Sequence, residues 1–332
     1  MSIATEISRL QTAKADLKTA IEAKGVTVPS SATIDTYDDY VSQISGGGGS
    51  PTPSNFESWE YNDWGHPTSI SVKTGVTSIP QKFQYGNSSL TACTLPNTIE
   101  TISGYAFTEC DSITSLTIPS GVTYIGDYSF QLCRKLSSIN VPSGVTYIGT
   151  YAFASCGSNN NEGCNVSNVD LTNVSASTYF KYVFSNAKLR GTLTIPNSVL
   201  SGASSGTTST CQNLFYGTYV NNAGLTLKVY ANGVVIPRNM CGFSYLSQNS
   251  DALNLIIYGT PTFLSRASIT CSSGGSVTFA DCTTPPNAES YSTASTSPFY
   301  NFKGTLYVPS AGLSAWKAKY TGIADKIKAI PS

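Results

Sequence analysis

Charged side chains are scarce in this 332-residue chain. Aspartate, glutamate, lysine and arginine together make up 11% of the residues, less than half of the roughly 25% that soluble proteins usually contain. The formal net charge is zero, and no basic patch is present that could follow a phosphate backbone. We therefore expect no nucleic-acid partner and a surface built mainly from serine, threonine, asparagine, glycine and tyrosine.

Histidine is scarcer still, which bears on catalysis and metal binding. The chain has one histidine, His66, and no C-x-x-C motif, so few zinc sites can be built from it. The carboxylates form no recognisable pair of the kind that glycosidases use, and the glycine run at 46–49 is not followed by the Lys-Ser or Lys-Thr of a phosphate-binding loop. We therefore predict no enzyme activity, no cofactor and no metal, with His66 as a surface or capping residue.

Long apolar runs are missing as well. None approaches the ~20 residues that a transmembrane helix needs, and the opening MSIATEISRL lacks the charged-then-apolar layout of a secretion signal. We therefore predict that the chain does not insert into a membrane.

What the chain does contain is a 23-residue period over residues 92–156. The segments ACTLPNTIETISGYAFTEC, SLTIPSGVTYIGDYSFQLC and SINVPSGVTYIGTYAFASC align without gaps, with isoleucine, phenylalanine and cysteine recurring in each. A fixed short period is typical of a solenoid, in which each repeat is one coil. One coil buries too little apolar surface to fold alone, so its stability must come from bonds and core shared with its neighbours.

Alternating apolar and polar residues predict one short strand in each coil, for about ten coils. The spacing widens in the second half, where Gly/Ser/Asn/Thr-rich stretches at 157–165 and 201–210 predict inserted loops. The predicted strands are 69–72, 92–95, 115–118, 138–141, 169–171, 192–195, 225–229, 253–257, 277–279 and 305–308.

The run IPSGVTYIGDYSFQLCRKLSSINVP resembles the BspA-type leucine-rich repeat, of the form L-x-x-I-x-I-P-x-x-V-x-x-I-G-x-x-A-F-x-x-C. The closing TFADCTTPP and GTLYVPSAGLSAWKAKY are similar to the final strand and capping helix of such arrays. The resemblance covers roughly residues 69–332 and implies a curved, β-rich α/β solenoid with a parallel sheet on one face, used for adhesion and recognition. We predict a cap at 55–68, a leucine-rich-repeat solenoid at 69–303, and a last strand with a capping helix at 304–332.

Residues 1–44 form a different module. An apolar stripe with one lysine predicts a helix over about 4–24, followed by a second short helix at about 34–44. Isoleucine and leucine at both heptad core positions favour a homotrimer, although the stripe could instead pack on the second helix. We predict a helical anchor or oligomerisation segment, joined to the solenoid by a Gly/Ser/Pro linker at 45–54. The stripe consists of Ile3, Ile7, Leu10, Lys14, Leu17 and Ile21.

The segment ISRLQTAKADLKTAIEAKGVTVPSSATIDTYDDYVSQI resembles N-terminal segments of bacteriophage tail and fibre proteins. This resemblance, over about residues 3–44, implies attachment to other virion proteins; a virion assembled in the host cytoplasm needs no secretion signal. We predict a phage appendage whose solenoid binds a host-surface glycan or protein. One alternative is a non-recognising decoration of the capsid or tail. Another is a bacterial surface adhesin, which would require a secretion signal.

The outward-facing side chains of the strands locate a candidate ligand site. Small polar groups such as Thr194 and Asp170 dominate, whereas the later coils add aromatic residues. An aromatic ring beside amides and hydroxyls is typical of sugar-binding surfaces, although these tyrosines could merely flank the strand ends. The predicted site consists of Lys228, Tyr230, Asn254, Ile256 and Tyr258.

Two further sets of residues recur in register. Cys110, Cys133 and Cys156 are predicted to form an inward ladder at about 4.8 Å spacing, too wide for the ~3.8 Å between disulfide Cβ atoms, so we predict buried thiols. Tyr124 and Tyr147 are predicted to form an exposed pair.

Overall fold

The computed structural model describes most of the repeat region. Outside the described residues lie the linker at 45–54, His66 and the predicted anchor stripe of Ile3, Ile7, Leu10, Lys14, Leu17 and Ile21. In the described part, no helix is long and apolar enough to cross a membrane. The described residues are Lys18, 56–61, 67–160, 162–175, 180–201, 203, 211–241, 253–265, 269, 275–288, 298–299 and 302–332.

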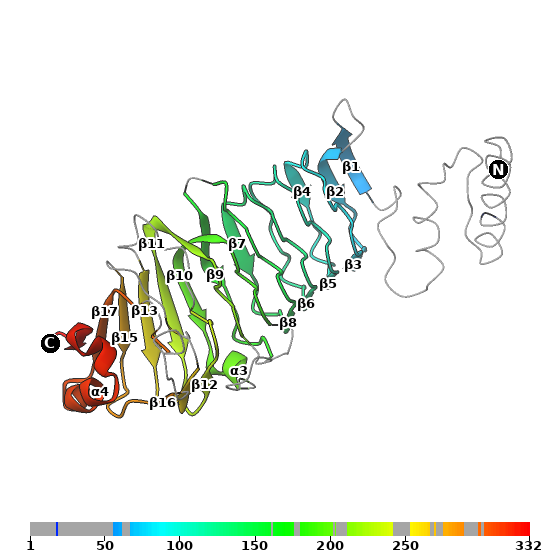
Figure 1. Ribbon diagram of the computed structural model, residues 1–332. Coiled ribbons are helices and arrows are strands. Elements are labelled where there is room, and N and C mark those ends of the chain that lie inside the picture. Colours follow the sequence, from blue (N-terminus) through cyan, green and yellow to red (C-terminus); the bar gives the residue numbers. More distant parts are fainter. Residues whose placement is uncertain are drawn as a thin grey trace, which may run out of the picture.

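Parallel strands stack side by side along an elongated molecule (Figure 1). The largest sheet has eight strands in the order β18-β17-β15-β13-β11-β10-β9-β7, and every neighbouring pair in it is parallel. This arrangement confirms the predicted leucine-rich-repeat solenoid. The strands are β7 (Ser138–Val141), β9 (Cys164–Val169), β10 (Lys188–Ile195), β11 (Tyr219–Tyr230), β13 (Leu253–Tyr258), β15 (Ser276–Phe279), β17 (Thr305–Val308) and β18 (Ile327–Ala329).

The N-terminal coils carry a separate three-stranded sheet. In it β2 (Pro67–Val72) pairs in parallel with β4 (Ala92–Thr94) and antiparallel with β1 (Phe56–Tyr61), which thereby covers the outer edge of the first coil. The strand predicted at 115–118 is wrong, because this segment keeps the alternation of exposed and buried residues but forms no strand. The sheet is therefore interrupted between β4 and β7.

One strand lies earlier in the chain than its predicted position. The sequence pattern placed it at 169–171, whereas β9 ends at Val169. Ser167 and Asn168 are both exposed, so the alternation that marks a strand in the sequence is broken within β9. The alternation resumes only at Val169, the last residue of β9. The sequence pattern therefore placed the strand too late in the chain.

A second ladder of two-residue strands, not predicted from the sequence, runs along another side of the coils. β3 (Ser78–Ile79), β5 (Thr101–Ile102), β6 (Tyr124–Ile125) and β8 (Tyr147–Ile148) pair in parallel, and the isoleucine of each is buried. Later coils repeat the feature with β12 (Val235–Ile236), β14 (Phe263–Leu264) and β16 (Asn287–Ala288).

The third side of each coil is a turn that hydrogen-bonds to the next coil. The N–H groups of Tyr105, Phe107 and Glu109 donate to the carbonyls of residues 127, 129 and 131 over 2.9, 2.7 and 2.8 Å. The first and last of these donors have positive φ angles of 60° and 62°, an uncommon conformation for residues with a side chain. Such strain persists only where the surroundings enforce it, and here the inter-coil bonds do so.

Aromatic rings inside the turn form a continuous stack. Phe107, Phe130, Phe153, Phe184 and Phe215 follow one another with centroid distances of 5.4, 5.3, 6.0 and 5.6 Å. The last two steps span 31 residues each instead of 23. The longer coils therefore place their extra residues elsewhere and keep the core in register.

The C-terminal end is closed by the helix α4 (Leu313–Lys319), flanked by the 3-10 segments η4 (Ser310–Gly312) and η5 (Thr321–Lys326). Trp316 is fully buried, and its indole N–H donates to the Cys282 carbonyl over 2.9 Å. The prediction that 305–308 is the last strand is wrong, because β18 follows the helix and pairs with β17. β18 contains one large apolar residue, Ile327, followed by Lys328 and Ala329, so its sequence gives no clear strand pattern. The other helix of the described part is α3 (Asn197–Leu200), directly after β10.

Coil-to-coil spacing leaves no room for a side chain at Gly126, where a Cβ atom would lie 2.5 Å from the Gly104 nitrogen. We predict that Gly126→Ala lowers the free energy of unfolding by about 1–3 kcal/mol, because the two coils must separate. Denaturant unfolding followed by circular dichroism measures this. The matched control is Gly322→Ala, where no heavy atom lies within 4 Å, and equal effects of the two substitutions would contradict the explanation.

Candidate functional site

The outward residues of the large sheet form one continuous row. Thr194, Lys228, Ile256, Thr278 and Tyr307 are partners in register from β10 to β17, and all five are half-buried. Their strand neighbours on either side point into the core. The row is therefore a surface supported from below by packed apolar side chains.

Four of the five predicted ligand residues form two adjacent pairs on this surface. Lys228 lies opposite Ile256, and Tyr230 lies opposite Tyr258. Asn254 lies one row away, opposite Thr226, and its side-chain oxygen accepts a hydrogen bond from the Ser276 hydroxyl over 3.3 Å. The structure thus brings the predicted residues together on β11 and β13.

The two tyrosine rings stack on each other. Their centroids are 4.9 Å apart with an interplanar angle of 16°, and Tyr230 is 44% exposed. Because β11 lies between β10 and β13, the other face of the Tyr230 ring looks toward β10, where Pro196 follows the last residue of the strand. The exposed part of the Tyr230 ring is therefore accessible to a ligand on the surface of the sheet.

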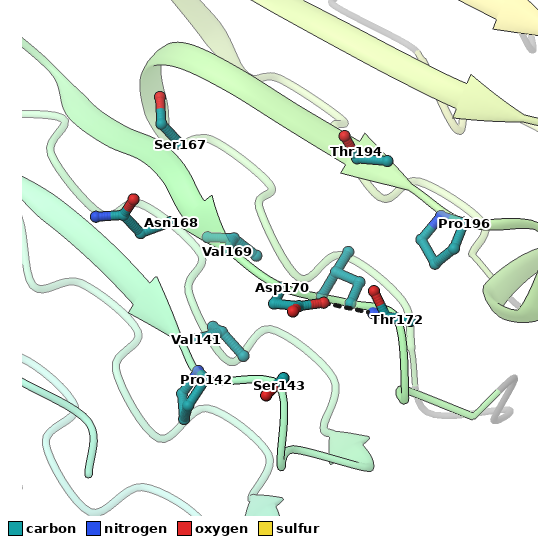
Figure 2. Close-up of a pocket in the computed structure, with 11 residues that line it drawn as sticks. Val141, Pro142, Ser143, Ser167, Asn168, Val169, Asp170, Thr172, Thr194 and Pro196 are labelled. Carbon is teal, nitrogen blue, oxygen red and sulfur yellow. Dashed lines mark hydrogen bonds between the residues drawn. The ribbon is translucent and has the colours of Figure 1, made fainter. Parts of the chain in front are cut away.

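A polar depression lies on that same side, and the sequence analysis did not predict it. It has a volume of about 590 Å³ and is formed by the carboxyl ends of β7, β9 and β10 with the turns that follow them (Figure 2). Its polar groups come from Ser143, Ser167, Asn168, Asp170, Thr172 and Thr194.

The depression exists because β9 and β10 diverge. Their pairing is confined to Leu189 with Cys164 and Arg190 with Asn165, and the next residue of β10, Gly191, has a φ of +98°. A Cβ atom there would collide with the Ser167 hydroxyl, which accepts a hydrogen bond from the Thr192 N–H over 3.1 Å. At this point β10 therefore bonds to the side chain of Ser167 and not to the backbone of β9.

Asp170 is the single charged residue among those that line the depression. Hydrogen bonds from the side chain and the backbone N–H of Thr172 lower the pKa of the Asp170 carboxyl, and the backbone bond measures 2.9 Å. The carboxylate is therefore ionised and held in one orientation at neutral pH. Alternation in the sequence predicts Asp170 as an outward residue, but no sequence signal indicates that strands diverge beside it.

The depression and the tyrosine pair adjoin each other. Thr194 lines the depression and is the register partner of Lys228. Pro196 also lines it and follows Ile195, whose partner Val229 precedes Tyr230. At about 4.8 Å per strand, the row from β10 to β13 spans about 10 Å, so one elongated ligand can reach both features.

The second predicted tyrosine pair lies on a different ladder. The rings of Tyr124 and Tyr147, on β6 and β8, stack at 4.5 Å with an angle of 2°, and Tyr124 is 39% exposed. On the turn side, Tyr105, Tyr128, Tyr151 and Tyr182 form a further stack with distances of 4.8, 5.2 and 4.6 Å.

The structure confirms the inward ladder of cysteines. The thiols of Cys110, Cys133 and Cys156 donate to the carbonyls of Gln84, Phe107 and Phe130 over 3.3, 3.2 and 3.2 Å. All eight cysteines in the described part are buried and none of them forms a disulfide. Within that part no three histidine, cysteine or carboxylate side chains are grouped so as to hold a metal ion.

Comparison with known proteins identifies the repeats. Residues 61–162 match the model of the BspA type leucine-rich repeat region, in six copies, while no curated protein matches the chain. A solved leucine-rich repeat protein from Bacteroides ovatus is similar at 14% identity, over 83% of this chain and 98% of that one, with a TM-score of 0.28. That TM-score is too low to support an argument, so the fold assignment depends on the repeats and the strand pairing.

The buried thiols predict that stability falls in alkaline solution. Burial raises the pKa of Cys93 and of Cys164 to about 12, and raises that of Cys133 and Cys156 well above its usual value. The unfolded chain releases these protons near pH 8.5 and the folded chain does not. The stabilisation is therefore complete below about pH 8.5 and is lost as the pH rises toward 12.

Urea unfolding between pH 7 and 9.5 measures this effect. The free energy of unfolding should be nearly constant up to about pH 8 and then decline, with a limiting slope of about 1.4 kcal/mol per pH unit for each thiol. Cys133→Ala should make the decline shallower. A stability that does not change up to pH 9.5 would show that the thiols titrate normally.

Proposed function

We propose that the solenoid is a recognition domain that binds a carbohydrate of a host cell surface, without catalysis, on the face formed by β9, β10, β11 and β13. The observation that carries this proposal is the juxtaposition of the exposed Tyr230 ring with the polar depression beside it. An aromatic ring supports the apolar face of a sugar, while hydroxyl, amide and carboxylate groups bond its hydroxyls.

The remaining surface favours a glycan over a protein ligand. Protein interfaces have a core enriched in aromatic residues, methionine and arginine. In the described residues, the exposed large hydrophobic side chains are four tyrosines, Tyr85, Tyr124, Tyr216 and Tyr230, on different coils. The chain also carries no net charge, so there is little electrostatic attraction for a charged protein.

We further propose that this domain belongs to a bacteriophage tail or fibre-type appendage, located in the virion. The support is the resemblance of residues 3–44 to N-terminal segments of phage structural proteins, together with the heptad stripe that favours a trimer. Residues 1–44 would then bind other virion proteins or trimerise. A capsid or tail decoration without a ligand and a bacterial surface adhesin are the competing functions.

We predict that the double variant Tyr230→Ala/Tyr258→Ala loses binding to glycans, because it removes the aromatic platform while the buried neighbours Val229 and Ile257 keep the strands in place. The measurement is binding of the fluorescently labelled chain to a bacterial glycan array. The expected loss is tenfold or more, since each aromatic contact contributes about 0.5–1.5 kcal/mol, two rings are removed, and a tenfold change corresponds to about 1.4 kcal/mol.

The matched control is Tyr124→Ala/Tyr147→Ala, which removes an equally stacked pair from a different ladder. It should leave array binding unchanged. If both double variants bind as the parent does, the proposed surface is wrong. If the parent binds no glycan at all, the domain is a decoration or recognises a protein.

The role of the N-terminal module is tested by light scattering of the full chain and of residues 55–332. We predict that the full chain is a trimer and the shorter chain a monomer, because the heptad stripe supplies the association. Monomers in both cases would mean that residues 1–44 dock on another virion protein instead. A trimer that persists without these residues would contradict the assignment of the stripe.

A further inference from the structure

We propose that the depression between β9 and β10 is a subsite for one uncharged sugar unit, whose hydroxyl groups donate to the Asp170 carboxylate. This inference deepens the proposed function and rests on it. It assigns the class of ligand, a neutral glycan, and names the residue that selects it.

Charge is the first argument. Asp170 is the one charged side chain among the residues that line the depression, and its hydrogen bonds with Thr172 keep it ionised. A uronic or sialic acid placed here would bring a second carboxylate beside the first, and like charges at short distance repel. An uncharged sugar instead offers hydroxyl donors to a group that only accepts, and such bonds to a charged acceptor are the stronger kind.

The arrangement of the other side chains is the second argument. Figure 2 shows the Asp170 carboxylate held against Thr172 at the end of β9, with Thr194 and Pro196 on one side of it and Ser143 on the other. A carboxylate has about four lone-pair positions, and the Thr172 bonds leave some of them for a ligand. Val169 and Pro196 supply apolar surface next to these polar groups. A sugar ring likewise has apolar faces beside polar hydroxyl groups, so the two surfaces are complementary.

Size and continuity are the third argument. The volume of about 590 Å³ falls within the ~300–1,000 Å³ of small-molecule sites, and the depression opens on the sheet face. A glycan unit seated there can continue over Thr194 toward the exposed part of the Tyr230 ring, one strand further on. The subsite and the aromatic platform would therefore hold neighbouring units of one chain.

The test is saturation-transfer NMR of the full chain with four single sugars as probes: methyl α-mannoside, methyl α-glucoside, methyl β-galactoside and the anionic methyl β-glucuronide. We expect at least one neutral glycoside to bind and the glucuronide not to bind. Asp170→Asn should weaken the neutral sugar about tenfold or more, the loss expected for a hydrogen bond to a charged group. This substitution keeps the side-chain oxygen that accepts the Thr172 N–H, so the turn should persist.

Glu100→Gln is the matched control, because Glu100 is an exposed carboxylate on an early coil far along the chain from the depression, and it should leave binding unchanged. Binding of the glucuronide as tight as that of the neutral sugars would overturn the inference. The inference would also be overturned if the neutral glycosides bound to Asp170→Asn as tightly as to the parent but did not bind to Tyr230→Ala. The proposed function would still stand after that result. Array binding without any single-sugar signal would also overturn the subsite alone, whereas failure of both assays would overturn the subsite and the proposed function together.

Discussion

Backbone hydrogen bonds between coils are the interaction on which this structure depends. A coil buries too few apolar groups to offset the entropy of ordering its residues, so each coil is stable only as a neighbour of the next. The bonds run along three sides: the large sheet, the two-residue ladder of β3, β5, β6 and β8, and the turns. The turns show how strongly these bonds constrain the chain, because residues such as Tyr128 and Leu132 adopt positive φ angles of 58° and 62° to make them.

The same constraint explains why the depression lies where it does. Most of the large sheet is a closed ladder that presents a flat row of half-buried side chains. Between β9 and β10 the ladder opens after Arg190, and Gly191 and Ser167 set the divergence in place of backbone pairing. The resulting hollow keeps polar groups near one another on a rigid support, which reduces the ordering cost of binding a polar ligand.

The sequence was sufficient to predict the fold because a solenoid repeats its core positions. Ile125, Phe130 and Cys133 are buried in the structure as their 23-residue spacing requires. The regular 23-residue spacing is not visible in the sequence after Cys156, since the next coils are longer and Ala187 and Thr218 occupy the cysteine position in two of them. The structure shows why this is tolerated: the Thr218 hydroxyl donates to the Phe184 carbonyl over 2.6 Å, as the Cys156 thiol does to Phe130.

The site was predictable only in part. Tyr230 and Tyr258 were found because alternation along a strand fixes which residues point outward. The depression could not be found, because it depends on two strands diverging at a glycine, and the sequence has 28 glycines, of which none is marked by its neighbours as the point of divergence. The two-residue ladder was missed for a similar reason, since two residues are too few to establish a period. Structure beyond the repeated core thus depends on contacts between coils that sequence spacing does not encode.

Amide hydrogen exchange of the full chain tests the central claim, that inter-coil bonding holds the solenoid and its surface together. The account predicts that the amides of Phe107, Phe130, Phe153 and Phe184, each bonded to the following coil, exchange slowly and as a group, because opening one coil must release its neighbours. The exposed turn at Thr74 should exchange rapidly in the same sample. If the four phenylalanine amides exchange as fast as Thr74, or at unrelated rates, the coils are not coupled through these bonds and the account is wrong.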